Sequence, residues 1–240
     1  MIRLDKFLAD AGYGTRSEVK KQLKSGIVSV NGAVCKKSEE KIDPACDVVT
    51  VAGNEVVYEA FSYYLFYKPA GCVTAKSDTL HKTVMDYFPE IVRKSCSPVG
   101  RLDKDTEGVL LITDDGGLNH HLMSPAHHVK KTYYAVLDRE VPVSAIHQFA
   151  EGVDIGDEKK TLPAELEILP RQMQDTTNPV YHANLTISEG RFHQVKRMFE
   201  TVGCHVVYLK RLSLGNLSLG ELTPGEYRRL SETEVTDLRK

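Results

Sequence analysis

The sequence predicts an α+β protein with a small N-terminal helix-helix-strand domain and a larger, mainly antiparallel mixed-sheet domain. Three observations lead to this prediction. The N-terminal quarter carries two helical patterns followed by short strands, the rest is dominated by β-rich runs, and helical patterns do not alternate regularly with those runs. We expect domains at 1–59 and 60–240, with a flexible joint near 53–61.

The N-terminal domain begins with a predicted short helix and ends with short strands. Apolar residues from Leu4 to Ala11 follow helical spacing, and Gly12 ends the run. The stretch IVSVNGAVC (27–35) has the pattern of a strand, an Asn-Gly turn and a second strand. DVVTVAG (47–53) adds another short strand.

A second helix is predicted between these segments. Either Thr15 or Ser17 can cap its start, Glu18 completes a capping box with Thr15, and Gly26 stands where a C-terminal glycine cap belongs. Basic side chains recur at four-residue intervals and should share one face of this helix. They are Arg16, Lys20 and Lys24.

The larger domain is predicted from β-rich runs and from helical patterns between them. The β-rich runs are 63–67, 109–113, 133–137, 164–169, 180–187 and 205–209. The helical patterns lie near 82–88, 117–123, 143–151 and 191–202. In the last of these an apolar stripe is expected to face the core. It consists of Phe192, Val195, Phe199 and Val202.

Composition excludes several classes of protein. No apolar run is long enough to cross a membrane, and the N-terminus MIRLDKFLADAG is charged where a signal peptide would be apolar. We therefore expect a cytoplasmic protein. The five cysteines are odd in number and include no C-x-x-C pair, which argues against a disulfide framework and a zinc site.

Charge is distributed unevenly along a chain whose formal net charge is only -2. Residues 1–24 hold six basic side chains against three acids, and residues 191–211 hold five basic side chains against one acid. Local excesses of this kind can create a positive surface on a nearly neutral protein. Solvated helix faces give similar counts, so both interpretations stay open.

The stretch GRLDKDTEG (100–108) places Asp103, Asp105 and Glu107 at alternate positions, like the start of a calcium loop. A calcium loop needs flanking helices and a bidentate Glu at its twelfth position. Here a Pro- and Gly-containing segment precedes the stretch, a strand follows it, and Asp114 is the twelfth residue. A surface turn and a turn that holds one catalytic carboxylate remain.

The apolar neighbours of this stretch favour a turn fixed to the core. Leu102 stands between charged residues, and an apolar strand begins at Val109. We expect Leu102 to be buried and Asp103 to be held rigidly at the edge of a sheet. Asp105 and Glu107 are expected to be turn and surface residues.

Several long motifs resemble those of the pseudouridine synthases, in the branch that modifies single uridines of bacterial ribosomal RNA. They occur in the family's order as YKPAG (67–71), GRLDKDTEGVLLITDDG (100–116), KTY (131–133) and ISEGRFHQVKRMFETVGCHVVYLKRLSLG (187–215). Residues 3–32 are similar to the small RNA-binding domain named after the fourth protein of the small ribosomal subunit. The resemblance covers nearly the whole chain.

The resemblance implies an isomerase that converts a specific uridine of 16S ribosomal RNA to pseudouridine by base flipping, without a cofactor or a metal. The alternatives are action on 23S ribosomal RNA and a noncatalytic assembly factor that binds ribosomal RNA. The implied partner is ribosomal RNA, either free or in a partly assembled small subunit. A monomer is expected.

The resemblance also implies roles for single residues. Asp103 matches the catalytic aspartate, Tyr133 the active-site tyrosine that stacks on uracil, and Lys196 the basic partner of the aspartate. Arg101 matches the residue that enters the gap left by the flipped nucleotide, and Leu209 the apolar residue beside the target base. Without the motifs, Tyr133 and Leu209 would be interpreted as core residues and Arg101 as a surface arginine.

The remaining expected RNA contacts are basic. On phosphates such side chains position the RNA without reading its sequence. They are Arg16, Lys20, Lys21, Lys24, Arg191, His193 and Arg197. For the C-terminal three, a solvated face or a structural histidine is the competing interpretation. Lys68 and Pro69, in a predicted loop, are expected to support the site without taking part in chemistry.

Overall fold

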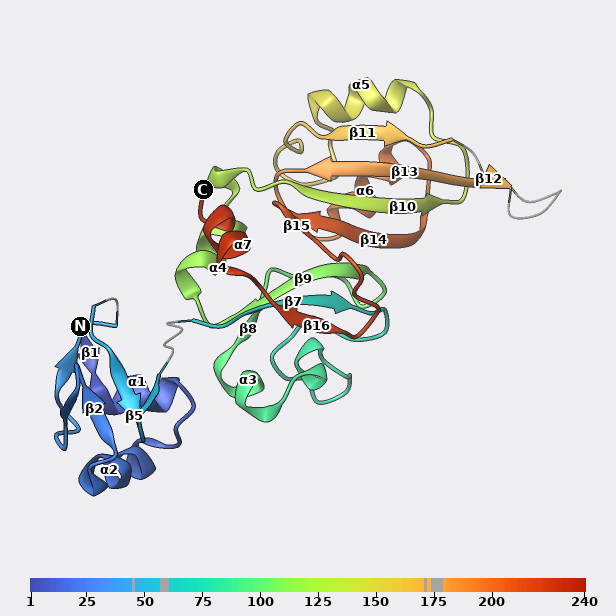
Figure 1. Cartoon of the computed structure of the whole chain (residues 1–240). Helices are drawn as coiled ribbons and strands as arrows, with labels where there is room; N and C mark the ends of the chain where they lie inside the picture. The colour runs from blue at the N-terminus through green and yellow to red at the C-terminus, as the bar shows by residue number, and fades with distance from the viewer. Residues whose placement is uncertain (45, 57–60, 171, 174–178) are drawn as a thin grey trace. The chain divides into compact units, whose positions relative to one another are not determined.

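The computed structural model describes the chain except for residues 45, 57–60, 171 and 174–178 (Figure 1). The chain divides into two compact units, Met1–Phe61 and Ser62–Lys240. The predicted boundary between residues 59 and 60 lies outside the described residues, as does part of the expected joint, so both stay predictions.

The N-terminal unit has two helices and short strands, as expected. Its helices are α1 (Leu4–Asp10) and α2 (Arg16–Ser25). A sheet of order β3-β2-β5-β6 contains β2 (Val28–Val30), β3 (Ala33–Val34), β5 (Val49–Val51) and β6 (Asn54–Glu55). A separate pair joins β1 (Ile2–Arg3) to β4 (Lys41–Ile42), two short strands that the sequence patterns did not predict.

The predicted caps of α2 are confirmed, with Thr15 and not Ser17 at the start. The Thr15 hydroxyl accepts from the Glu18 amide, and the Glu18 carboxylate accepts from the Thr15 amide. Gly26 ends the helix in the left-handed region at φ 80°. Val19 and Leu23 of α2 enter the core of this unit.

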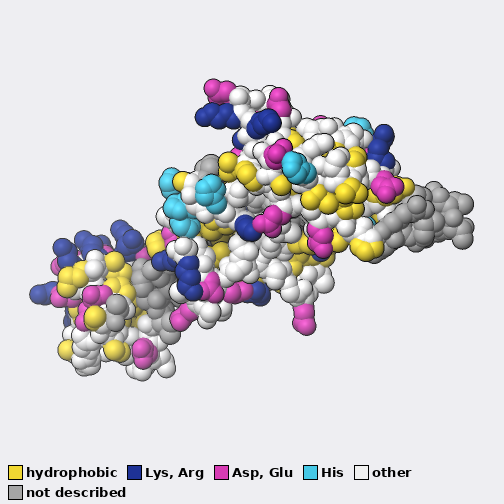
Figure 2. Space-filling view, turned by 90° about the horizontal axis from the view of Figure 1, so that it is seen from above, with side chains coloured by type: hydrophobic (Ala, Val, Ile, Leu, Met, Phe, Trp, Pro, Cys, Tyr) yellow, Lys and Arg dark blue, Asp and Glu magenta, His cyan; other side chains and the backbone are white. Residues whose placement is uncertain are grey.

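The buried face of α2 leaves its basic residues exposed. Arg16, Lys20, Lys21 and Lys24 all lie at the surface of this helix. Figure 2 shows Lys and Arg side chains gathered over the N-terminal unit. The capping box and the buried stripe thus orient the helix so that its cations face outward.

The second unit is built on one large sheet with order β11-β13-β10-β14-β9-β7-β16 (Figure 1). Along this order the strands are β11 (Glu165–Ile168), β13 (Pro179–Ile187), β10 (Lys131–Leu137), β14 (Val206–Leu214), β9 (Glu107–Thr113), β7 (Tyr63–Lys68) and β16 (Tyr227–Arg229). Three short strands extend the sheet: β8 (Ser97–Val99), β12 (Gln172–Met173) and β15 (Leu217–Ser218). Among the described strands only β14 and β9 pair in parallel, so the predicted mainly antiparallel sheet is confirmed.

The parallel pairing joins the two halves of this sheet at Gly108. A Cβ atom there would overlap the Arg211 carbonyl oxygen and lie 2.6 Å from the Arg211 nitrogen. The φ of Gly108 is 115°, a value that residues other than glycine rarely adopt. Glycine therefore lets β9 reach β14 immediately after the Asp103 turn.

Helices cover the sheet halves and produce separate cores. α5 (Ser144–Glu151) and α6 (Gln194–Thr201) contribute Phe149 and Phe199 to the core that also contains Tyr133 and Leu209. α4 (Gly116–Met123) and α7 (Glu232–Leu238) contribute to a second core, around β7 and β9. A third core lies on the other face of β7 and β9, which explains why both strands are almost continuously apolar.

Several boundaries differ from the sequence predictions. The helix expected over 82–88 is the shorter 3-10 helix η1 (Val84–Tyr87), and the one expected over 191–202 begins only at Gln194. The helices α3 (Glu90–Ser95) and α7 and the 3-10 helix η2 (Pro125–His127) were not predicted. Within the described ranges, no helix is long and apolar enough to cross a membrane.

Candidate active site

The Asp103 turn connects β8 to β9 and is fixed to the core through Leu102. The Leu102 side chain is buried. The Thr74 hydroxyl accepts from the Leu102 amide at 3.1 Å and donates to the Leu102 carbonyl at 2.7 Å. The expected attachment of this turn to the core is therefore confirmed, and it immobilises the residue immediately before Asp103.

Lys68 holds the other side of the same turn. It is the last residue of β7 and is fully buried, and its Nζ donates to the carbonyl oxygens of Thr106 at 2.8 Å, Pro69 at 3.1 Å and Lys104 at 3.4 Å. Burial lowers the pKa of this ammonium. The Gly71 amide also donates to the Lys104 carbonyl, at 2.7 Å. The segment 67–71 is thus a support for the Asp103 turn.

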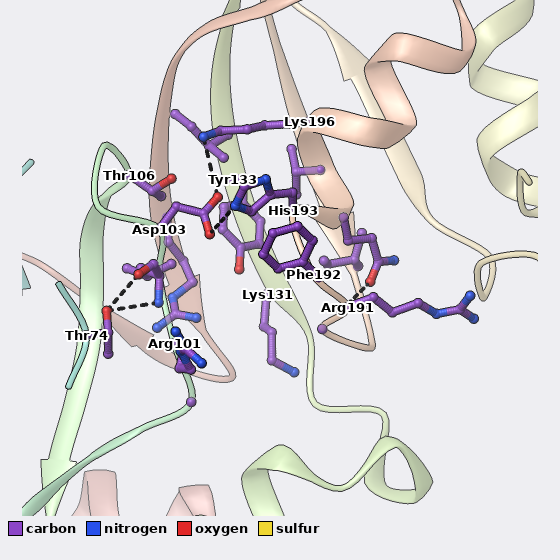
Figure 3. A pocket seen from close by; sticks show the side chains of 18 of the residues that line it. Thr74, Arg101, Asp103, Thr106, Lys131, Tyr133, Arg191, Phe192, His193 and Lys196 are labelled. Atoms are coloured by element: carbon purple, nitrogen blue, oxygen red, sulfur yellow. Dashed lines mark hydrogen bonds and ion pairs between the residues drawn. The ribbon is translucent and has the colours of Figure 1, made fainter. Parts of the chain in front are cut away.

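Asp103 opens into a pocket of about 570 Å³ in the second unit. The pocket brings together the five residues that the family resemblance assigns to the site and His193, one of the expected RNA contacts (Figure 3). They are Arg101, Asp103, Tyr133, His193, Lys196 and Leu209. They come from the β8–β9 turn, β10, the start of α6 and β14, so only the folded sheet places them side by side.

Two nitrogen-bearing side chains flank the Asp103 carboxylate. Lys196 Nζ lies 3.4 Å from Asp103 Oδ2, and His193 Nε2 lies 3.4 Å from Oδ1. The Asp103 side chain remains 29% exposed. The expected neighbourhood of Asp103 and Lys196 is therefore present, and the carboxylate is open to the pocket.

Asp105 makes a contact with Lys196 that the sequence did not indicate. Lys196 Nζ donates to both of its carboxylate oxygens, at 2.7 and 2.8 Å, which is closer than its approach to Asp103. Burial would raise the pKa of Asp105, but the hydrogen bond and the charge of Lys196 outweigh it, so the pKa is lowered. Lys196 is consequently shared between two carboxylates of one turn.

Glu107 is not the turn and surface residue that was expected. It begins β9, is half-buried, and accepts a hydrogen bond of 2.9 Å from the Tyr208 hydroxyl. The Asp103 turn is flanked by strands and not by helices, which contradicts the calcium-loop geometry. Among the described residues, no group of three or more His, Cys, Asp or Glu side chains is placed to hold a metal ion.

The floor of the pocket is aromatic, aliphatic and cationic. Tyr133 and Leu209 are buried and line it, whereas Tyr134 points to the other face, where its hydroxyl lies 2.9 Å from His182 Nδ1. Lys131 and Arg211 also line the pocket, with 6% and 2% of their surfaces exposed. Neither forms an ion pair with a described carboxylate, and Arg211 Nη2 is buried without a partner. Burial, with the charge of Arg211, lowers the pKa of Lys131 to about 8.

Two of the expected RNA contacts are engaged within the protein. Arg191 donates to the Lys159 carbonyl at 2.5 Å and to the Lys160 carbonyl at 2.8 Å. Arg197 donates to the Ile155 carbonyl and pairs with Asp157 at 2.6 Å. These contacts tie the start of α6 to the 155–160 loop, so direct RNA contacts by the two arginines stay predictions.

Phe192 is not part of the core stripe, because it precedes the first turn of α6. The residue is 76% exposed and lines the pocket. Its ring stacks on that of His193, with centroids 3.8 Å apart and planes 16° apart. Val195 and Phe199 are buried as expected, with Val202 packed against them. Gly190 is acceptable as the residue before a helix that starts at 191, so the local sequence contains no signal for this exception.

Comparison with known proteins identifies the family of this chain. Residues 62–201 match the model of the RNA pseudouridylate synthase family, and residues 2–49 match the S4 domain. The chain is 47% identical to an uncharacterized RNA pseudouridine synthase of Bacillus subtilis strain 168 over 236 residues, covering 98% of this chain and 97% of that one. It is 39% identical to ribosomal small subunit pseudouridine synthase A of Escherichia coli strain K12 over 240 residues, covering 99% and 100%.

A solved structure shows the same fold over the whole length. A crystal structure of a pseudouridylate synthase superimposes with a TM-score of 0.67 at 37% identity, covering 99% of this chain and 100% of that one. Family model, full-length relatives and fold therefore agree on one family. The chain belongs to the RNA pseudouridylate synthase family, a family of isomerases, and carries an S4 domain before its catalytic domain.

Proposed function

We propose that this protein isomerises one uridine of 16S ribosomal RNA to pseudouridine, with Asp103 as the catalytic group. The single observation that carries the proposal is the Asp103 carboxylate, fixed in a pinned turn and open to a pocket that also holds Tyr133, Lys196 and Leu209. The chain is similar over its full length to ribosomal small subunit pseudouridine synthase A of Escherichia coli. This similarity supports 16S RNA, the RNA of the small subunit, as the target in preference to 23S RNA.

The reaction is an isomerisation that needs no external oxidant or reductant. The bond from ribose C1′ to uracil N1 breaks, a bond from C1′ to C5 of the same ring forms, C5 loses its proton and N1 gains one. The protein must place a carboxylate beside the sugar, retain the detached base while it turns, and assist removal of the C5 proton. Water must be kept from C1′, since its attack would give hydrolysis.

The pocket residues fit these tasks. Asp103 acts on the ribose, while Lys196 supplies positive charge beside the reacting groups. Tyr133 and Leu209 line the pocket, which supports a role for the Tyr133 ring in stacking on uracil, for its hydroxyl in removal of the C5 proton, and for Leu209 in packing against the base. Lys68 and Thr74 act through the turn and hold Asp103 in position.

A uridine within structured RNA must be flipped out to reach Asp103, which costs a few kcal/mol. Arg101, exposed at the rim, enters the gap that the nucleotide leaves. Phosphate contacts by Arg16, Lys20, Lys21 and Lys24 of the S4 domain offset part of the cost. The enzyme works as a monomer, in the cytoplasm where ribosomal RNA is made and assembled.

The decisive experiment measures tritium release from 16S ribosomal RNA whose uridines carry tritium at C5. We expect release by the native protein and none by Asp103→Asn, with RNA affinity of the variant within about threefold of native, because the carboxylate acts on the reacting atoms and not on the phosphates. Binding is measured on the same RNA by fluorescence anisotropy.

The same assay decides between the alternatives. Release from 23S but not from 16S RNA would move the target to the large subunit. RNA binding without release from either RNA would identify a noncatalytic assembly factor. Undiminished release by Asp103→Asn would show that Asp103 is not the catalytic group.

A further inference from the structure

The Phe192–His193 pair at the pocket rim is a feature that the proposed reaction leaves unused. Most of the Phe192 side chain is in solvent, although it is among the largest apolar side chains in the protein. Figure 3 shows its ring beside the His193 ring, with Asp103 on the other side of His193. A single exposed apolar side chain is ordinary on a protein surface, but Phe192 lines the pocket, and aromatic side chains that line pockets commonly contact the ligand.

The pair is held rigidly by its surroundings. His193 adopts the left-handed region, at φ 48°, which is uncommon for a residue with a side chain. Arg197 donates to the Phe192 carbonyl at 3.1 Å, and the Arg191 amide donates to the Gln194 side chain at 2.9 Å. With the guanidinium contacts to the 155–160 loop, these bonds fix the backbone on both sides of Phe192, so a ligand would meet a preorganised ring.

We propose that the exposed face of Phe192 is a stacking platform for the base of a nucleotide that flanks the target uridine. Unpaired RNA bases are commonly held by stacking on aromatic side chains. The inference rests on the proposed function, because it assumes an RNA with an extruded uridine at Asp103.

The positions of Asp103, His193 and Phe192 determine which base can stack on Phe192. His193 Nε2 is 3.4 Å from the Asp103 carboxylate, and Phe192 lies on the face of the His193 ring. The target uridine has to bring its sugar to Asp103 and its base to Tyr133, so the Phe192 face is one ring further out. A neighbouring base, released from its stack when the uridine flips, is the group within reach.

The platform is tested by binding on an Asp103→Asn background, which prevents turnover. We expect Phe192→Leu to weaken binding of a 16S fragment by roughly 5- to 100-fold, the range for loss of one stacked base, and Phe192→Tyr to stay within about threefold. Ile91→Ala is the matched control, because Ile91 is 71% exposed on α3 and does not line the pocket. Thermal unfolding should be unchanged in all three, since the replaced side chains are exposed.

A second readout locates the base. The position of the modified uridine is first mapped by primer extension after carbodiimide treatment. 2-Aminopurine is then placed immediately before or immediately after that uridine. Quenching should occur at one of these positions with Phe192 and Phe192→Tyr, and should be lost with Phe192→Leu.

Equal affinities for Phe192→Leu and the parent would overturn the platform, as would quenching that does not depend on residue 192. The affinity measurement does not require catalysis. A native protein that binds the RNA but releases no tritium therefore contradicts the proposed function, while the affinities still decide the stacking inference.

Discussion

Lys196 illustrates how a single side chain serves two neighbours in this site. Its ammonium is hydrogen-bonded to both oxygens of Asp105 and lies 3.4 Å from Asp103. Asp105 therefore holds the cation more closely than Asp103 does, which in the proposed mechanism leaves the Asp103 carboxylate oxygens for the substrate. This division of labour between two acids of one turn gives the alternate spacing of Asp103 and Asp105 a purpose other than metal binding.

Lys131 is a residue whose burial costs stability. Its pKa falls from 10.5 to about 8 because the charged form is desolvated beside Arg211. Below pH 8 the ammonium is charged in both folded and unfolded states, and the folded state bears the cost. Between pH 8 and about 10.5 the unfolded state binds the extra proton, so stability rises with pH, and above that range the cost disappears.

We therefore expect Lys131→Met to be more stable than the native protein at pH 7, by on the order of 3 kcal/mol, because the pKa falls from 10.5 to about 8 and one pKa unit corresponds to about 1.4 kcal/mol. The difference in the free energy of unfolding between the two proteins, here called the gap, should shrink toward zero by pH 10.5. Its kcat/KM on RNA should fall, since the pocket loses a cation. Urea unfolding at the two pH values measures the gap.

Lys130→Met is the control for that measurement, because Lys130 is an exposed neighbour paired with Glu165 and should change stability by less than about 0.5 kcal/mol. A difference in the free energy of unfolding that is absent at pH 7, or that does not change with pH, would show that the burial of charged Lys131 does not destabilise the protein.

At the scale of elements, the site depends on how β7 and the segment after it hold the β8–β9 turn. Lys68 at the end of β7 donates to three carbonyl oxygens, and Thr74 grips both polar groups of the Leu102 backbone. Two segments far from Asp103 in the sequence thus fix its position. A strand end and a loop therefore hold the turn in place.

For Lys68→Met we expect kcat to fall about 10- to 100-fold while KM for RNA changes little. The reason is that carbonyl oxygens lose their donor and the turn shifts, and small misplacements of a catalytic group are costly. Single-turnover and steady-state tritium release separate the two parameters.

Lys94→Met serves as the comparison for Lys68→Met, because Lys94 lies exposed on α3 in an i,i+4 pair with Glu90. A rise in KM at unchanged kcat would assign Lys68 to RNA binding. Circular dichroism at the assay temperature checks that Lys68→Met remains folded.

At the scale of the whole molecule, the two units carry different parts of the task. The pocket and its acids belong to the second unit, and the exposed cations of α2 belong to the first. A net charge of -2 conceals this arrangement. Binding to the RNA backbone and chemistry on one nucleotide should therefore be separable by substitution.

The variant in which Arg16, Lys20 and Lys24 are all changed to Gln tests this separation. We expect RNA affinity to fall and the slope of log K against log salt to become less negative by roughly 0.7 for each phosphate that the protein no longer neutralises. At saturating RNA, kcat should remain within about threefold of native. Filter binding at several salt concentrations supplies the slope.

A charge-matched control changes three exposed lysines outside α2, namely Lys36, Lys37 and Lys41. If this control alters affinity and salt slope as much as the α2 variant, then net charge matters and the α2 face does not. A loss of kcat at saturating RNA in the α2 variant would contradict the separation.

Sequence patterns alone were sufficient to predict the elements that depend on local chemistry. The caps of α2 at Thr15 and Gly26, the apolar strands β7 and β9 and the burial of Leu102 all follow from side-chain pattern, because each depends on residues close in the chain. The long motifs placed the chain among the pseudouridine synthases. The same reasoning could have predicted α7, because a capping box from Ser231 to Glu234 marks its start.

The contacts between distant segments became visible only in the folded protein. Lys196 binds Asp105 as well as approaching Asp103, Lys68 supports the turn from beneath, and Phe192 lies at the rim and outside the core. Periodicity assigns a residue to a face only once the helix has begun, and Phe192 precedes that point. Pairing across the sheet follows from strand order and register, which local pattern does not encode.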